Sequence, residues 1–359
     1  MYEYRHGGNV HAESGSENFL DLSASLNPLG FPKQIEDVVH REIKNCNRYP
    51  DNNSTRLCEA IAKFEHVSPD TIFCAGGSSD IIFRLASCVK NRPGLVLVPS
   101  FSDYSRAMKS RDMEIVYHPL DEETGFQCNE NLLNTIEITN PGILFFCNPN
   151  NPTGVLTPRS FIEELLHKCS KAGTLAVIDE CFIDFCEKAI DATAKPLLHE
   201  YANLVVLKAF TKIFDLPGLR LGYAICTDPA VIELLHYHGP DWPVSNLAQS
   251  AGIAVLNNAE GYIISTIEYV LNERKYIVQE LQNLGYIVYD SSANFVFFKN
   301  PYDFDLKKKL DNENIRIRSF DAFDGLGPEY CRVGVSQFPN NIRFIEAMQK
   351  ITPKTWRNH

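Results

Sequence analysis

Short apolar runs that alternate with longer helical stretches limit most strongly how this chain can fold. Between residues 71 and 226 the sequence contains six such runs, at 71–74, 95–98, 142–147, 174–178, 203–208 and 221–226. The stretches between them carry apolar residues at helical spacing. Strands that alternate with helices are typical of βαβ units, whose strands run parallel. The sequence therefore predicts an α/β fold in which helices sandwich a mostly parallel central sheet.

One segment illustrates the helical signal, and a later change in pattern indicates a second domain. Thr157 is a suitable N-cap, Pro158 follows at the first helical position, and Gly173 ends the apolar periodicity. After about residue 243 come long helical stretches, then short strands and a C-terminal helix. A length of 359 residues also fits about two domains. We expect an N-terminal arm associated with the small domain, a large domain and a smaller α+β domain, at residues 1–30, 31–240 and 241–359.

Composition narrows the classes of partner and compartment. The net charge of -11 would repel a nucleic-acid backbone, so we expect no nucleic-acid partner. No apolar run approaches the roughly 20 residues that span a bilayer, and the N-terminus lacks a signal-peptide core, so we expect no membrane association. Eleven cysteines without a CxxC pair are typical of reduced thiols in a cytoplasmic protein. The His236-Tyr237-His238 segment lacks an acidic or cysteine partner at ligand spacing, so we expect no metal.

Polar side chains follow three of the predicted strands at the point where each strand ends. Asn151 lies in a Pro-Asn-Asn-Pro loop after the third apolar run, Asp179 directly follows the fourth, and Lys212 follows the fifth. Each has an ordinary explanation when taken alone: a tight turn, a helix cap or a solvated lysine. Because the carboxyl ends of parallel strands meet at one edge of a sheet, we expect these side chains to lie close together.

Two further features join this set and point to one cofactor. Ser78 and Ser79 follow two glycines at a helix start, where free N–H groups can bind an anion, although neither GxxxxGK nor GxGxxG is present. Arg220 follows Lys212 by eight residues. Pyridoxal 5'-phosphate (PLP) explains the whole set. Lys212 can form a Schiff base with its aldehyde, Asp179 can keep its ring nitrogen protonated, Asn151 can donate to its phenolate oxygen, and the serines with Arg220 can hold its phosphate.

The motifs resemble those of fold-type I PLP enzymes of the class I/II aminotransferase superfamily over essentially the whole chain. They are NPNNPTG, IDE, TK followed by PGLRLGY, and SANF. The resemblance implies that Tyr104 in PSFSDY stacks on the cofactor and that Arg332 in YCRVGV binds the substrate α-carboxylate. It also implies that Tyr49 in RYPD reaches the cofactor phosphate of a neighbouring subunit, so that a homodimer shares its active sites.

Within this superfamily, HGGN, SASLNPLG, DECFIDF and IRSF resemble the threonine-phosphate decarboxylases of the cobalamin pathway, which are related to histidinol-phosphate aminotransferases. The resemblance implies decarboxylation of L-threonine O-3-phosphate to (R)-1-amino-2-propanol O-phosphate. It assigns the substrate phosphate to His6, Asn27 and Arg318. Phe182 agrees with this group, because aminotransferases commonly have a tyrosine there.

Two residues depart from the group's pattern, and three alternatives stay open. Gly76 stands where the group tends to have asparagine, and Ser245 stands where relatives usually have asparagine. Decarboxylation of L-serine O-phosphate to ethanolamine phosphate is one alternative, because a pocket discriminates a single methyl group by only about 1 to 3 kcal/mol. The others are a histidinol-phosphate aminotransferase and a PLP-fold binding protein without turnover.

Overall fold

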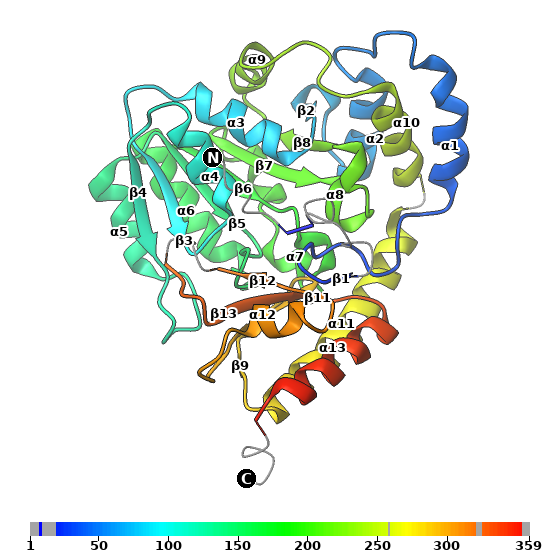
Figure 1. The fold of residues 1–359 in the computed structure, drawn as a ribbon. Coiled ribbons are helices and arrows are strands. Elements are labelled where there is room, and N and C mark those ends of the chain that lie inside the picture. Colours follow the sequence, from blue (N-terminus) through cyan, green and yellow to red (C-terminus); the bar gives the residue numbers. More distant parts are fainter. Residues whose placement is uncertain (1–6, 9–18, 258, 321–324, 354–359) are drawn as a thin grey trace.

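A central sheet of seven strands organises the larger part of the molecule (Figure 1). The computed structural model describes residues 7–8, 19–257, 259–320 and 325–353. The strands lie in the order β2-β8-β7-β6-β5-β3-β4, and only β8 runs antiparallel to its neighbours. The predicted mostly parallel sheet is therefore confirmed. The strands are β2 (Ile72–Ala75), β3 (Gly94–Val98), β4 (Ile115–Pro119), β5 (Ile143–Cys147), β6 (Leu175–Asp179), β7 (Leu204–Ala209) and β8 (Gly222–Ile225).

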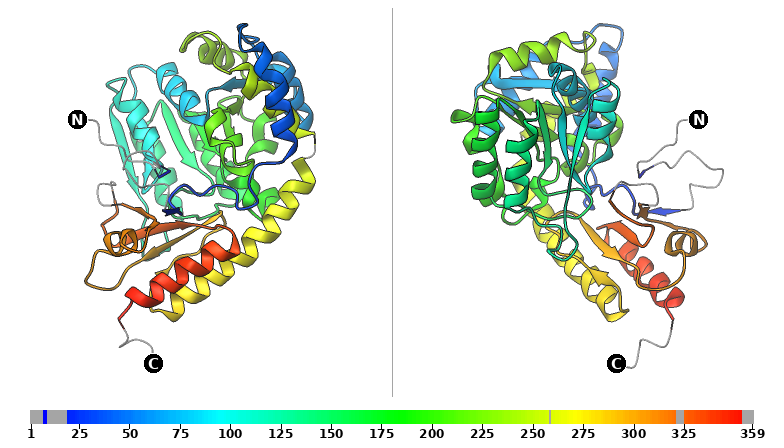
Figure 2. Two further views of the ribbon diagram at one scale, coloured as in Figure 1. Left: turned by 45° about the vertical axis from the view of Figure 1, so that its right-hand side comes forward. Right: turned by 90° about the vertical axis from the view of Figure 1, so that its left-hand side faces the viewer.

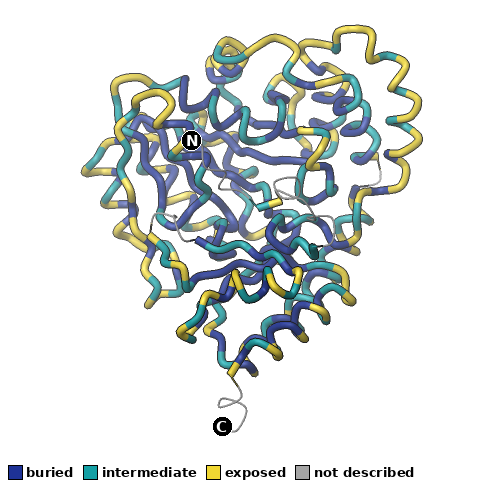
Figure 3. The backbone as a smooth tube through the Cα atoms, viewed as in Figure 1, coloured by how far each residue is buried: buried dark blue, intermediate teal, exposed yellow. Residues whose placement is uncertain are grey.

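Helices cover both faces of this sheet. Successive strand residues point to opposite sides, and because both sets are apolar, both faces have to be buried. Phe145 packs in one core with α3, α4 and α9, whereas its neighbour Phe146 packs in the other core with α2, α5, α6 and α10. Apart from β4, the strands are buried along nearly their whole length (Figure 3). The helices named here are α2 (Thr55–Glu65), α3 (Ser78–Cys88), α4 (Ser102–Lys109), α5 (Glu130–Thr139), α6 (Arg159–Ala172), α9 (Pro229–Tyr237) and α10 (Asn246–Leu256).

The start of α6 differs from the prediction by one residue. The helix begins at Arg159 with Pro158 in the N-cap position, and no side chain caps it. The backbone N–H of Thr157 instead donates to Asn148 Oδ1 at 2.8 Å, which ties Thr157 to the loop after β5. Gly173 ends the helix with a φ of 62°, as its position predicted.

A smaller antiparallel sheet forms the core of the C-terminal part, with strands in the order β12-β13-β10-β9. The long helix α11 (Ala259–Asn283) and α13 (Phe338–Ile351) lie side by side against it (Figure 2). In the N-terminal arm, β1 (Leu20–Asp21) pairs in parallel with β11 (Ile315–Arg316), which joins the arm to this part. The remaining elements of the sheet and its cover are β9 (Ile287–Val288), β10 (Phe295–Lys299), α12 (Leu306–Asp311), β12 (Arg318–Ser319) and β13 (Tyr330–Gly334).

The helix α10 packs with the large sheet rather than with the small one. It contacts α1 (Gln34–Glu42) and α2, and Asn246 donates to the backbone oxygens of Asn45 and Arg48 at 3.0 Å. We therefore propose that the large domain extends through α10, beyond the boundary at residue 240 that the sequence pattern predicted. Among the described helices, none is long and apolar enough to cross a membrane.

Candidate active site

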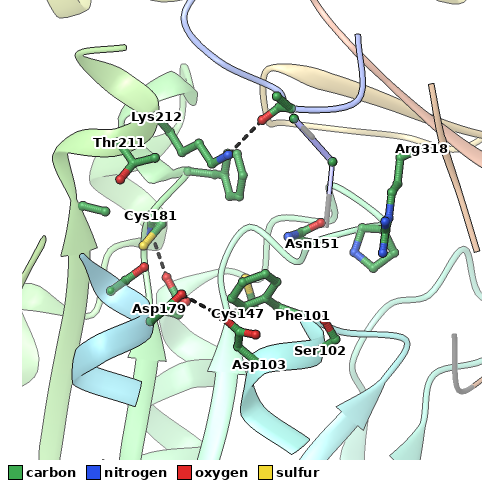
Figure 4. A pocket seen from close by; sticks show the side chains of 18 of the residues that line it. Phe101, Ser102, Asp103, Cys147, Asn151, Asp179, Cys181, Thr211, Lys212 and Arg318 are labelled. Carbon is green, nitrogen blue, oxygen red and sulfur yellow. Dashed lines mark hydrogen bonds between the residues drawn. The ribbon is translucent and has the colours of Figure 1, made fainter. Parts of the chain in front are cut away.

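A cavity of about 500 Å³ opens where the carboxyl ends of the parallel strands face the small sheet and the N-terminal arm (Figure 4). The segments that follow β3, β5, β6 and β7 contribute to its wall, as do the start of α3 and the strands β12 and β13. Nine of the predicted site residues line it together. They are Ser78, Ser79, Tyr104, Asn151, Asp179, Lys212, Arg220, Arg318 and Arg332.

Lys212 lies in the short helix α8 (Phe210–Ile213), which begins where β7 ends. Its Nζ donates to the backbone oxygen of Ala24 at 2.8 Å, and it lies 5.7 Å from the centre of the Phe182 ring. Burial, together with the positive charges of Arg332 and Arg220, lowers the pKa of Lys212 to about 8. A larger fraction of this side chain than of an ordinary lysine is therefore a neutral amine near neutral pH, and the neutral amine is the form that attacks a carbonyl.

Asp179 is the last residue of β6 and is only 4% exposed. Its Oδ1 accepts from the backbone N–H of Cys181 at 3.0 Å, and its Oδ2 accepts from the Tyr104 hydroxyl at 2.7 Å. Burial raises the pKa of Asp179, although hydrogen bonds from the Cys181 thiol, the Tyr104 hydroxyl and the Cys181 N–H act in the opposite direction. A cationic ring nitrogen brought to this carboxylate would offset the cost of its burial.

An anion cradle forms where β2 leads into α3. Gly77 has a φ of 91°, and a Cβ added to it would lie 2.9 Å from Arg220 Nη2. A Cβ on Gly222 would lie 2.6 Å from the backbone nitrogen of Ser78. The two glycines thus let a guanidinium and a strand backbone approach the first turn of α3, whose N–H groups have no partner within the helix. Donors and positive charge at this point fit a phosphate group.

Two arginines face each other in register on β12 and β13, where Arg318 pairs with Arg332. Arg332 is buried, and its guanidinium donates to Asn151 Oδ1 and to the Ser23 backbone oxygen. Among the described residues, its Nε has no hydrogen-bond partner. Burial, and then the charge of Arg318, lowers the pKa of Arg332 to about 9. A buried guanidinium with an unused donor beside a second guanidinium fits an anionic ligand.

Comparisons with known proteins decide the family. The aminotransferase class I and II profile matches residues 17–344. The chain belongs to this family.

Among the relatives of this class I and II aminotransferase chain, the threonine-phosphate decarboxylase of Salmonella typhimurium is 30% identical, over 98% of this chain and 97% of its own. A Caldanaerobacter subterraneus protein named as a candidate threonine-phosphate decarboxylase is 35% identical, over 97% of this chain and 94% of its own. The crystal structure of the histidinol-phosphate aminotransferase from Clostridium acetobutylicum matches with a TM-score of 0.86 and 28% identity, covering 93% of this chain and 99% of that one. Enzymes of this family use PLP, and the lysine, the carboxylate and the anion cradle described above fit that cofactor.

The structure corrects the prediction that the ring of Tyr104 stacks on the cofactor. Tyr104 is fully buried, and its ring stacks on Phe145 with centroids 5.1 Å apart. The hydroxyl group of Tyr104, not the face of its ring, points to Asp179 in the pocket. Phe101 precedes α4, is half-buried and lines the cavity (Figure 4), so it is the ring of the PSFSDY segment that can cover a cofactor.

Asn27, predicted to bind the substrate phosphate, does not line the cavity. Its Nδ2 donates to the Ile213 backbone oxygen at 2.7 Å and to Thr266 Oγ1 at 2.9 Å, and its Oδ1 accepts from the Leu29 N–H. The amide nitrogen holds the N-terminal arm against α8 and α11, and the amide oxygen bonds within the arm. Asn27 is therefore a structural residue.

The other predicted residues fall at the edges of the site. His6 lies outside the described residues, but Gly7 and Gly8 line the cavity, and the Gly8 N–H donates to Ser23 Oγ at 2.9 Å. Ser245 caps α10 through a bond from the Ala248 N–H, so its departure from the relatives' asparagine lies at a helix end.

Proposed function

We propose that this protein is a PLP-dependent decarboxylase of L-threonine O-3-phosphate that forms (R)-1-amino-2-propanol O-phosphate for cobalamin synthesis. The arginine pair carries the proposal, because Arg332 and Arg318 offer separate positions for two anionic groups on one small ligand. The names of the relatives from Salmonella typhimurium and Caldanaerobacter subterraneus support the same substrate.

The substrate's two anionic groups are assigned to different cations. Arg332 is buried and can bind a carboxylate with two parallel bonds, so it takes the α-carboxylate. Arg318 takes the phosphate. The Gly7-Gly8 segment lines the same cavity, and His6, which precedes it in the chain, is proposed to bind the phosphate as well. The net charge of -11 does not oppose this binding, because charges within the pocket dominate at short range.

The chain's own residues determine which bond at Cα breaks. When bound, PLP supplies an electron sink for the electrons released at Cα. Asp179 holds a negative charge that matches the protonated ring nitrogen. Arg332 would hold the α-carboxylate in one position, which would favour breaking of its bond to Cα with loss of carbon dioxide. Lys212, with a pKa of about 8, then carries the proton that Cα receives. Phe182 lines the cavity without a hydroxyl group to donate to the phenolate oxygen.

The proposal includes a cytoplasmic homodimer. Tyr49 is 78% exposed and stacks on the half-exposed Trp242, with ring centroids 4.4 Å apart. An exposed aromatic pair of this kind supports a protein interface, from which Tyr49 would reach the partner's cofactor phosphate. All eleven cysteines are free thiols, which supports a reducing compartment.

Product analysis tests the proposal against its alternatives. The holoenzyme is incubated with L-threonine O-3-phosphate, with L-serine O-phosphate, and with histidinol phosphate plus 2-oxoglutarate, and products are identified by mass spectrometry. We expect carbon dioxide and aminopropanol phosphate from the first. A higher kcat/KM with L-serine O-phosphate would show that serine phosphate is the preferred substrate. Glutamate from the third mixture would favour the aminotransferase that the Clostridium acetobutylicum structure represents. No product from any mixture would indicate a PLP-binding protein without turnover.

A further inference from the structure

One hydrogen bond at the wall of the pocket comes from a residue whose ring is packed in the core. Tyr104 is fully buried in the face of α4 that packs on the sheet, and its hydroxyl donates to Asp179 Oδ2 at 2.7 Å. The second oxygen of this carboxylate accepts from the Cys181 N–H at 3.0 Å. The Cys181 thiol also bonds this carboxylate and, like the Tyr104 hydroxyl, lowers its pKa. The Tyr104 hydroxyl and the Cys181 N–H hold the two carboxylate oxygens from different elements, which restricts rotation of the group.

The tyrosine ring has little freedom to move away from this position. It lies parallel to the Phe145 ring, with an interplanar angle of 6° and centroids 5.1 Å apart. Phe101 packs edge-on against it at 5.5 Å and 82°. Burial and the nearby Asp179 raise the pKa of the Tyr104 hydroxyl well above its usual value, so it remains a donor at physiological pH.

We propose that Tyr104 is a positioning residue that holds the Asp179 carboxylate in one orientation and keeps it ionised for the cofactor's ring nitrogen. This inference depends on the proposed function through the role of Asp179. A carboxylate that is 4% exposed and has no charged partner among the described residues is easily protonated. A hydrogen bond from a neutral hydroxyl favours the ionised form without adding a competing positive charge. The Tyr104 hydroxyl therefore leaves the carboxylate's negative charge available to PLP.

A second tyrosine provides a matched control. Tyr223 is also buried, and its hydroxyl donates to the buried carboxylate of Glu65, away from the cavity. Both Tyr104→Phe and Tyr223→Phe remove one hydroxyl that bonds a buried carboxylate and retain the ring. Only Tyr104→Phe removes a hydrogen bond from the carboxylate that is proposed to meet the cofactor, which is that of Asp179.

The test follows retention of PLP by the holoenzyme across pH. Samples of wild type, Tyr104→Phe and Tyr223→Phe are dialysed at a series of pH values, and retained PLP is measured by absorbance. Circular dichroism at each pH excludes unfolding. Losing a hydrogen bond to a charged group corresponds to about one to two pKa units, so we expect the pH midpoint of PLP loss to rise by about that amount in Tyr104→Phe alone.

A double variant separates action through Asp179 from a general packing effect. In an Asp179→Asn background, Tyr104→Phe should change the PLP dissociation constant less than twofold, because the ionised carboxylate is already gone. Equal midpoints in wild type and Tyr104→Phe, or an equal shift in Tyr223→Phe, would overturn the proposal. So would a full Tyr104→Phe effect in the Asp179→Asn background. None of these readouts requires turnover, so failure to decarboxylate threonine phosphate would refute the proposed function separately.

Discussion

Replacing Gly77 with alanine tests whether the start of α3 is the phosphate cradle. Gly77 has φ 91° and ψ 167°, a conformation that is essentially restricted to glycine. An added Cβ would also lie 2.9 Å from Arg220 Nη2 and 3.3 Å from its Cζ. The substitution therefore has two separate costs, one in the backbone and one in the position of the guanidinium.

The two costs act on different measurements. Backbone strain of this kind costs about 1 to 3 kcal/mol, which should lower the free energy of unfolding. The arginine side chain can move away because its far end is flexible, but it then leaves the anion. Loss of one charge-assisted bond costs about 1.5 to 3 kcal/mol, so the PLP dissociation constant should rise roughly ten- to a hundredfold.

The assay compares PLP titrations and thermal unfolding in Gly77→Ala with two other glycine variants. Gly76→Ala changes the adjacent residue, where the nearest atom to a Cβ would be the Pro243 oxygen at 3.5 Å and φ is not positive. Gly125→Ala places an alanine at a positive φ of 65°, where the added Cβ would have no atom within 4 Å. We expect only Gly77→Ala to weaken PLP binding. Affinity within twofold of wild type in Gly77→Ala, or an equal loss in Gly125→Ala, would refute the cradle.

Three further perturbations test the charges and the assembly. The rate at which cofactor-free protein captures PLP should rise with pH through about 8, the pKa of Lys212; in stopped-flow absorbance, a rise only near 10.5 would contradict the depressed pKa. Burial alone would raise the pKa of Glu65, but Lys208 and Lys195 lower it to about 2, so its stabilisation is present above about pH 4.5 and lost as pH falls toward 2. Glu65→Gln should therefore reduce the free energy of unfolding by about 3 to 5 kcal/mol at pH 7 and flatten its loss in that acid window, measured by urea titration; an unchanged acid limb would count against the pairing. Finally, mixing Tyr49→Phe with Lys212→Ala subunits should yield heterodimers with one restored site, and activity no higher than that of the separate variants would argue against shared sites.

The sequence predicted the large sheet well because its buried strands are continuous apolar runs. It missed β4, which lies at the sheet edge, where most of its residues are only partly buried. Without burial on both faces β4 lacks a continuous apolar run, whereas the opposite edge strand, β2, is fully buried and was predicted from its run. The pattern also changes near residue 243, in the loop before α10, and the contacts of α10 with α1 and α2 are the reason that we propose a later domain boundary.

Residues adjacent to strand ends were predictable, whereas those that depend on distant partners were not. Asp179 directly follows an apolar run and Lys212 lies shortly after another, so local pattern and parallel topology bring them together. Asn27 bonds to Ile213 and Thr266, which lie 186 and 239 residues away in the chain. No local pattern reports such partners.

The choice between the two rings of PSFSDY was accessible from periodicity. Tyr104, Ala107 and Met108 are buried at the i, i+3, i+4 spacing of a helix face against the sheet, while Phe101 precedes the helix. A tyrosine on that face meets the core, and only its hydroxyl can extend to a polar group.

Whole-chain charge and pocket charge answer different questions in this protein. The net charge of -11 is spread over a surface in contact with solvent, where each charge acts over a Debye length of about 8 Å at physiological salt. Burial instead lowers the pKa of both Lys212 and Arg332, and repulsion from neighbouring guanidinium groups adds to it, from Arg332 at Lys212 and from Arg318 at Arg332. This repulsion favours an anion between them, and an anion that binds there restores the proton affinity of both groups. The same cations therefore set both the nucleophilicity of the free lysine and the attraction for a phosphorylated acid, and neither property can be read from composition.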